Sequence, residues 1–392
     1  MSIVLPVGYR FGGIHSGLRA SEPGRLDLAV VLSESPATAA GVYTQNRVAA
    51  APVQLCRSRT PGNPFRGIVI CSGNANACTG NQGLADAHQM TKLMADAAGF
   101  SEGQALVCST GVIGRMLPMP ILEVGIPKVV AASGDSIDQL HSAASAILTT
   151  DTRYKITSYE LASSRLLGFA KGAAMIGPNM ATMLGFLFSD ANVPAAALQE
   201  ILAGAVDKTF NCISVEGHTS TNDTVLCLAN GQGKPLHGKE LDEFAQHIFL
   251  ACEDLARMIA EDAEGATHLV TIDIHGCTTD QEAKQIAKTV AESALVKTAV
   301  YGADPNWGRF VSAAGYAGVP FEETEVSLWM GPFELYRKGT PLPFDEKLVS
   351  TWMQENRTIH LKFELERGAG HCRFYTCDLT AEYVRLNADY TT

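Results

Sequence analysis

The stretch Lys171–Leu184 reads KGAAMIGPNMATML and places a threonine after a Gly-Pro-Asn turn and directly ahead of an apolar segment. A threonine hydroxyl in mid-chain is a poor nucleophile, because no base is guaranteed beside it. If the bond between Ala181 and Thr182 is cut, the new α-amine of Thr182 can take the proton from its own Oγ. The alternative is structural, since a β-branched residue also suits the opening of a buried strand. On these residues alone the structural alternative is favoured.

Strand-like and helix-like segments alternate along the rest of the chain, which predicts a mixed α/β fold built in layers. Residues 358–366 alternate between apolar and polar side chains, so this strand has one wet face and part of the sheet is antiparallel. Apolar runs between turn residues predict further strands, and helical spacing of apolar side chains predicts helices. These strands are expected at 28–32, 67–71 and 105–109, and the helices at 84–98, 139–148, around 194–205 and at 240–259.

Composition limits the function classes. The chain has 392 residues, enough for two ordinary domains or one large domain with a lobe, and its net charge of −11 argues against a nucleic-acid partner. No apolar run reaches the ~18 residues that a membrane span needs, and the N-terminus does not resemble a signal peptide. The ten cysteines form no C-x-x-C pair and the histidines no H-x-x-x-H pair. We therefore expect a reduced, cytoplasmic protein without a metal or a cofactor.

Several short sequence motifs that lie far apart in the chain point to a known protein family. They are STGVIG at 109–114, TTDT at 149–152, STNDT at 220–224, EGAT at 264–267, VKTA at 296–299, DPNWGR at 304–309, and the C-terminal segment from CDLT at 377–380 through Asn387 to Thr392. Together with residues 171–184 they resemble, in order, the ornithine acetyltransferase family of arginine biosynthesis, also called bifunctional glutamate N-acetyltransferase/amino-acid acetyltransferase. That family's self-cleavage pattern is K-G-x-G-M-I-x-P-N-M-A-T-M-L, from which only Ala174 departs here.

The resemblance implies a fold and an assembly. The family has a two-sheet αββα core, similar in logic to N-terminal-nucleophile hydrolases but with different connectivity. Self-cleavage would give an α chain of residues 1–181 and a β chain of residues 182–392 that starts at the nucleophile. The two chains would stay intertwined in one core with a smaller C-terminal lobe and pair into an α2β2 heterotetramer.

The resemblance also assigns catalytic roles. Thr182 is the cleavage residue and nucleophile, and its α-amine is the general base. Thr110 and Gly111 match the family's oxyanion-stabilising pair, which acyl transfer needs because charge develops on the substrate carbonyl. Taken alone, Thr110 and Gly111 read as an ordinary turn at the end of a strand.

A third implication concerns the amino-acid substrate. Lys171 matches a substrate-contacting lysine, for which the alternative is a solvated surface lysine. Glu264 matches a substrate-binding glutamate that faces the ornithine ammonium, and the alternative is a helix-end carboxylate in an acidic run. Either Thr149 or Thr150 contacts substrate, and the sequence leaves open which. Asn387 and Thr392 match residues that close over the amino acid, although C-terminal tails are usually frayed.

The expected activity is ping-pong transfer of an acetyl group from N2-acetyl-L-ornithine to L-glutamate through an acetyl-threonine, with acetyl-CoA as a candidate second donor. One departure is His218, which stands where the family has an acidic residue. The alternatives are an N-terminal-nucleophile amidase or aminopeptidase, a related acetyltransferase of secondary metabolism, and an uncleaved binding or scaffold protein.

Overall fold

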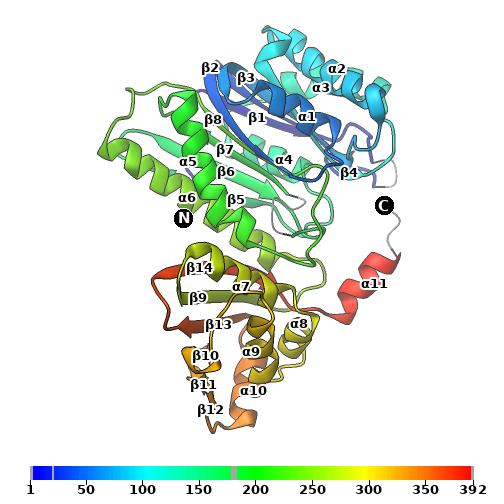
Figure 1. Cartoon of the computed structure of the whole chain (residues 1–392). Coiled ribbons are helices and arrows are strands. Elements are labelled where there is room, and N and C mark those ends of the chain that lie inside the picture. Colours follow the sequence, from blue (N-terminus) through cyan, green and yellow to red (C-terminus); the bar gives the residue numbers. More distant parts are fainter. Residues whose placement is uncertain (1–2, 20–21, 178–182, 390–392) are drawn as a thin grey trace.

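The computed structural model describes residues 3–19, 22–177 and 183–389, which form a large lobe and a smaller C-terminal lobe, each built on one β-sheet (Figure 1). The sheet of the large lobe has eight strands. They are β1 (Tyr9–Ile14), β2 (Leu28–Tyr43), β3 (Gly62–Asn74), β4 (Ala105–Val112), β5 (Lys155–Glu160), β6 (Arg165–Lys171), β7 (Leu184–Ser189) and β8 (Thr224–Ala229).

The order of these strands is β4-β3-β2-β8-β7-β6-β5, and β1 lies beside β2. The long strand β2 pairs with β1 through its first half and with β8 through its second half. Strand β6 is antiparallel to β7, with Lys171 opposite Leu184, and β7 is parallel to β8. Strands from both sides of residue 182 therefore belong to one hydrogen-bonded sheet.

Helices cover both faces of this sheet, because successive strand side chains point to opposite faces. Leu167 and Phe186 face a core that includes residues of α2, α3 and α4, whereas Leu166 and Leu187 face a core with α5 and α6. The mixed α/β layered fold predicted from the sequence is confirmed. The helices of this lobe are α1 (Ala51–Arg59), α2 (Gly80–Ala98), α3 (Met119–Ala132), α4 (Ile137–Ala146), α5 (Ala195–Lys208) and α6 (Lys239–Glu261), with short 3-10 turns at Glu102–Gln104 and Phe210–Cys212.

The C-terminal lobe lies below the large lobe in Figure 1 and has a six-stranded sheet of order β12-β11-β10-β13-β9-β14. Its strands are β9 (Leu269–Cys277), β10 (Val326–Met330), β11 (Phe333–Arg337), β12 (Thr340–Pro341), β13 (Thr358–Leu365) and β14 (Gly370–Cys377). Its helices are α7 (Asp280–Glu292), α8 (Ala294–Tyr301), α9 (Trp307–Gly315), α10 (Glu346–Glu355) and α11 (Ala381–Asp389), with a 3-10 turn at Glu323–Glu325. Burial alternates along β13 as predicted, and β13 is antiparallel to β10 and parallel to β9.

The structure extends one predicted strand far beyond its expected end. Strand β2 continues to Tyr43 through a segment rich in serine and alanine, which has no apolar alternation. Ala37, Ala39 and Ala40 are fully buried there, and the Gln199 side chain of α5 bonds both backbone groups of Gly41 at 3.0 Å. Small side chains therefore let α5 approach this part of the strand closely. Across the ranges described, no helix has both the length and the hydropathy needed to cross a membrane.

Candidate active site

Two residues of the predicted site meet although their strands are not neighbours in the sheet. Thr110 lies near the end of β4 and Lys171 at the end of β6, and Lys171 Nζ donates a hydrogen bond to Thr110 Oγ1 at 3.1 Å. Both residues are only 2% exposed. The alternative of a solvated surface lysine is therefore wrong.

The Lys171 ammonium is buried without a close counter-ion. Among the described residues, no carboxylate oxygen lies within 4 Å of its Nζ, and its hydrogen-bond partner is a neutral hydroxyl. Burial lowers the pKa of Lys171, and the more distant Asp151 opposes this. Burying a charge is costly unless a partner neutralises it. Lys171 is therefore suited to bind an anion such as a substrate carboxylate.

The backbone at Gly111 requires glycine. Its φ is +132°, and a Cβ atom there would lie 2.3 Å from the carbonyl carbon of Gly73 and 2.6 Å from the amide nitrogen of Asn74. The close approach follows from the parallel pairing of β3 with β4, which places Gly73 opposite Gly111. An exposed glycine thus directly follows the buried Thr110. Their role as an oxyanion pair stays a prediction.

A carboxylate that sequence reasoning left without a role organises the threonine-rich loop. Asp151 accepts hydrogen bonds from Lys155 Nζ at 2.7 Å, from the Gly172 amide at 2.6 Å and from the Thr149 amide at 3.1 Å. Its own burial raises the pKa of Asp151, but Lys155 and Lys171 outweigh burial and bring that pKa to about 2. The loop is therefore tied to the chain that leaves β6. Thr149 is half-buried and Thr150 is exposed.

Glu264 and Asn387 lie together near the segment that follows β6. The Glu264 amide donates to the Ala173 carbonyl at 2.9 Å, and Asn387 Nδ2 in α11 donates to Glu264 Oε2 at 3.1 Å. A Cβ atom on the following Gly265 would lie 2.6 Å from the Tyr383 amide nitrogen, so α11 approaches this loop closely. The helix α11 runs from Ala381 to Asp389.

The STNDT segment joins the site through a contact that the sequence did not predict. Asn222 Nδ2 donates to the carbonyls of Ala75 and Ser109, at 2.6 and 2.8 Å, and so holds the residue that precedes Thr110. The nearby His218 is exposed. The predicted residues Ala181, Thr182 and Thr392 lie outside the described residues.

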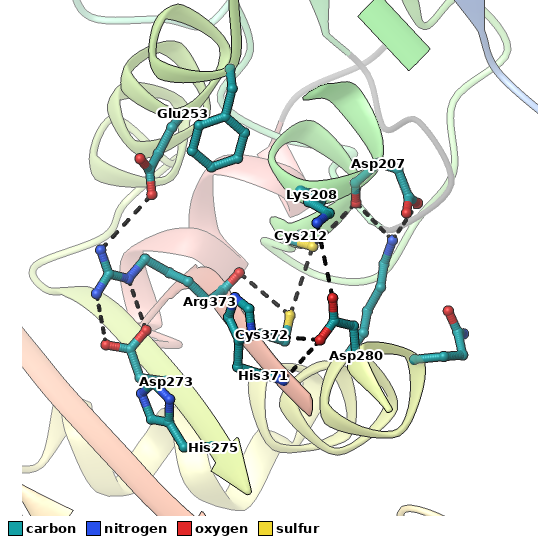
Figure 2. Close-up of a pocket in the computed structure, with 13 residues that line it drawn as sticks. Asp207, Lys208, Cys212, Glu253, Asp273, His275, Asp280, His371, Cys372 and Arg373 are labelled. Atoms are coloured by element: carbon teal, nitrogen blue, oxygen red, sulfur yellow. Dashed lines mark hydrogen bonds and ion pairs between the residues drawn. The ribbon is translucent and has the colours of Figure 1, made fainter. Parts of the chain in front are cut away.

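A cavity of about 410 Å³ lies apart from these residues, between α5 and α6 of the large lobe and β9, α7 and β14 of the C-terminal lobe (Figure 2). Its lining lysines and arginine pair with carboxylates: Arg373 bonds Asp273 at 2.8 and 2.9 Å, and Lys284 bonds Asp207 at 2.7 Å. None of the predicted site residues lines it. Within the described ranges, no group of three or more His, Cys, Asp or Glu side chains could hold a metal ion.

Comparisons with known proteins identify relatives over the full chain. A model of the ArgJ family matches residues 10–392. The arginine biosynthesis bifunctional protein ArgJ of Parasynechococcus marenigrum is 43% identical over 396 residues, covering 100% of this chain and 95% of that protein. The Geobacillus kaustophilus protein of the same name is 41% identical over 401 residues, covering 100% and 96%. A crystal structure of the Bacillus halodurans protein of that name is 40% identical, with a TM-score of 0.50, and the match covers 51% of this chain and 96% of that chain.

Proposed function

Since this chain belongs to the ArgJ family, we propose that it is a glutamate N-acetyltransferase of arginine biosynthesis, which moves the acetyl group of N2-acetyl-L-ornithine to L-glutamate. The name of the relatives also supports a second activity, for which we propose acetyl-CoA as the acetyl donor to glutamate. The observation that carries the proposal is the buried Lys171 ammonium, which bonds Thr110 beside Gly111 without a close counter-ion.

The first step of the proposal is self-cleavage. Thr182 Oγ attacks the Ala181 carbonyl carbon, the C–N bond breaks, and the Thr182 nitrogen takes the hydroxyl proton to become a free amine. Water then hydrolyses the resulting ester, which leaves a carboxylate on Ala181 and restores the Thr182 hydroxyl. The Bacillus halodurans structure supports this step. The match covers 96% of that chain but only 51% of this one, so that chain is about half as long as this one, as a cleavage fragment would be.

The acetyl transfer follows as a ping-pong reaction. Thr182 Oγ attacks the acetyl carbonyl carbon while the Thr182 α-amine takes the hydroxyl proton and passes it to the departing ornithine nitrogen. The glutamate amine then attacks the acetyl-threonine, which restores the hydroxyl. The Thr110 hydroxyl and the Gly111 N–H stabilise the oxyanion in both halves.

Substrate recognition is assigned from charge. Lys171 binds the α-carboxylate, and Glu264 faces the side-chain ammonium of ornithine, with Asn387 holding the Glu264 carboxylate by their 3.1 Å hydrogen bond. The Thr149 loop lines the site and Thr392 closes it. We further propose an α2β2 heterotetramer in the cytoplasm, with no metal or cofactor besides the substrates.

The test combines chain mass with activity. In purified protein we expect two fragments, the second of which begins at Thr182, and acetylornithine turnover that depends on glutamate. Thr182→Ala should remain one chain near 41.7 kDa and be inactive, whereas Thr182→Ser keeps the hydroxyl and should still cleave. An active intact chain, or a different fragment start, contradicts the cleavage step. Turnover that glutamate does not accelerate would instead identify an amidase.

A further inference from the structure

The chain is held firmly just before the segment that contains Thr182. Ile176 is fully buried, and its amide donates to Glu216 Oε1 at 2.5 Å. Its carbonyl accepts hydrogen bonds from the amides of Val215 at 2.8 Å and Gly217 at 3.2 Å. A Cβ atom on Gly177 would lie 2.4 Å from the carbonyl carbon of Gly217, so the two backbones touch.

The chain is held in the same manner just after that segment. The Met183 amide donates to Asp223 Oδ1 at 3.1 Å, and the Met183 carbonyl accepts from the Thr224 amide at 3.2 Å. The pairing of β7 with β8 begins at the next residue, where Leu184 lies opposite Thr224. Asp223 is fully buried.

Glu216 and Asp223 share an uncommon environment. Each uses one carboxyl oxygen for a backbone amide, while its other oxygen is buried without a hydrogen-bond partner in the described part of the chain. Burial raises the pKa of Glu216 to about 7 and that of Asp223 well above its usual range. The charged groups that face them, Lys297 for Glu216 and Lys171 for Asp223, do not reverse these shifts. A protonated carboxyl is neutral and still offers its carbonyl oxygen to an N–H group.

We propose that Glu216 and Asp223 are positioning residues that hold the backbone at Ile176 and Met183, so that the peptide bond before Thr182 is presented for cleavage. The inference rests on the proposed function. Both carboxyl groups come from residues 214–224, and Asn222 in that segment also bonds the Ser109 carbonyl. One segment therefore fixes both ends of the cleavable connection relative to the strand that carries Thr110. Such fixing matters because small misplacements of reacting groups cost about 100-fold in rate.

The test measures the rate at which newly translated full-length chain is cleaved. We expect Glu216→Ala and Asp223→Ala to slow cleavage by about tenfold or more. Glu216→Gln and Asp223→Asn keep a neutral acceptor oxygen and should stay within a few-fold of wild type. Asp273→Ala, which removes a buried carboxylate from the C-terminal lobe, is the matched control and should cleave normally.

Several outcomes would overturn this inference. If the alanine variants cleave at the wild-type rate, the two carboxyl groups have no positioning role. If the amide variants cleave as slowly as the alanine variants, the effect comes from the charge of the carboxylates and not from their acceptor oxygens. If the alanine variants do not fold in a thermal melt, Glu216→Asp decides, because it keeps the carboxyl group but shortens its reach and should still slow cleavage. If the wild-type chain itself stays uncleaved, the proposed function fails too. Failure of the positioning role alone, with a wild-type chain that is cleaved, is therefore a different result.

Discussion

The Lys171 site and the cavity between the lobes are both rich in charge, but they treat charge differently. In the cavity, Arg373 pairs with Asp273 at hydrogen-bond distance, as the dashed lines of Figure 2 show, and Lys284 pairs with Asp207 at 2.7 Å. At the site, Lys171 is buried against the Thr110 hydroxyl, and within the described ranges no carboxylate oxygen lies within 4 Å of its Nζ. A cation that is already paired with a carboxylate has little charge left to attract a ligand. The comparison indicates that an incompletely neutralised buried charge marks the proposed site better than cavity size does.

The largest expected effect tests whether the region around Thr110 is catalytic. Thr110→Ala removes one oxyanion donor, and such a loss typically costs about 10²- to 10³-fold in rate. Both half-reactions should fall together, because both pass through the same kind of intermediate. Rapid-quench measurement of acetyl-enzyme formation and decay checks this. A change confined to the affinity for one amino acid would make Thr110 a binding residue.

A direct contrast between the two regions comes from two lysines. Lys171→Met removes the cation assigned to the substrate carboxylate and should lower kcat/KM for acetylornithine about 100-fold, as a charge-assisted hydrogen bond of ~3 kcal/mol predicts. Lys284→Met breaks the pair with Asp207 in the cavity and should change kcat/KM less than about twofold. Steady-state kinetics of both variants decide the matter. Equal losses would show that the contrast between the regions is wrong.

The next contrast uses two glutamates. Glu264→Gln weakens the contact with the ornithine ammonium, and we expect roughly tenfold slower acetyl-enzyme formation from acetylornithine. Formation from acetyl-CoA involves no ornithine and should change much less. Glu253→Gln, in the cavity lining, is the control and should leave both unchanged. Equal losses with the two donors would assign Glu264 a structural role.

The smallest expected effect is on stability and depends on pH. The pKa of Glu216 is raised by burial to about 7, so its stabilising contribution is present below pH ~4.5 and is lost as the pH rises through 7. In the C-terminal lobe, His360 and Arg373 outweigh burial and lower the pKa of Asp273, so its contribution is lost only in acid. Wild type should therefore lose about 1 kcal/mol of stability, or roughly a degree or two of Tm, between pH 6 and 8. Glu216→Gln should lose less. Identical Tm profiles would contradict the assignment.

The sequence predicted the elements whose apolar pattern is regular. The alternation at 358–366 became β13, and the helical spacing at 240–259 became α6. The second half of β2 was missed, because small residues such as Ala37 and Ala39 make a close approach to α5 and carry no strand-like alternation. Local pattern therefore predicts elements well where a strand or helix meets ordinary apolar partners.

The site likewise contains residues that the sequence predicted and residues that it did not. Thr110, Lys171, Glu264 and Asn387 were predicted by resemblance, and the structure brings them together in two hydrogen-bonded pairs. The roles of Asp151, Glu216 and Asp223 were not predicted, because each depends on a backbone amide from another part of the chain. A carboxylate that binds a main-chain N–H leaves no trace in the spacing of side chains.

The shared sheet has a consequence for how such a protein reaches its native state. Strand β7 pairs with β6 on one side and with β8 on the other, so residues before and after 182 complete one sheet. An uncut chain closes this sheet as a single molecule, with a loop-closure cost that grows slowly with length. Two separated fragments would first have to meet, and their refolding would depend on concentration. If the chain is cleaved as proposed, it would assemble once, as its own precursor, and the lifetime of its folded state would be set by the rate of unfolding.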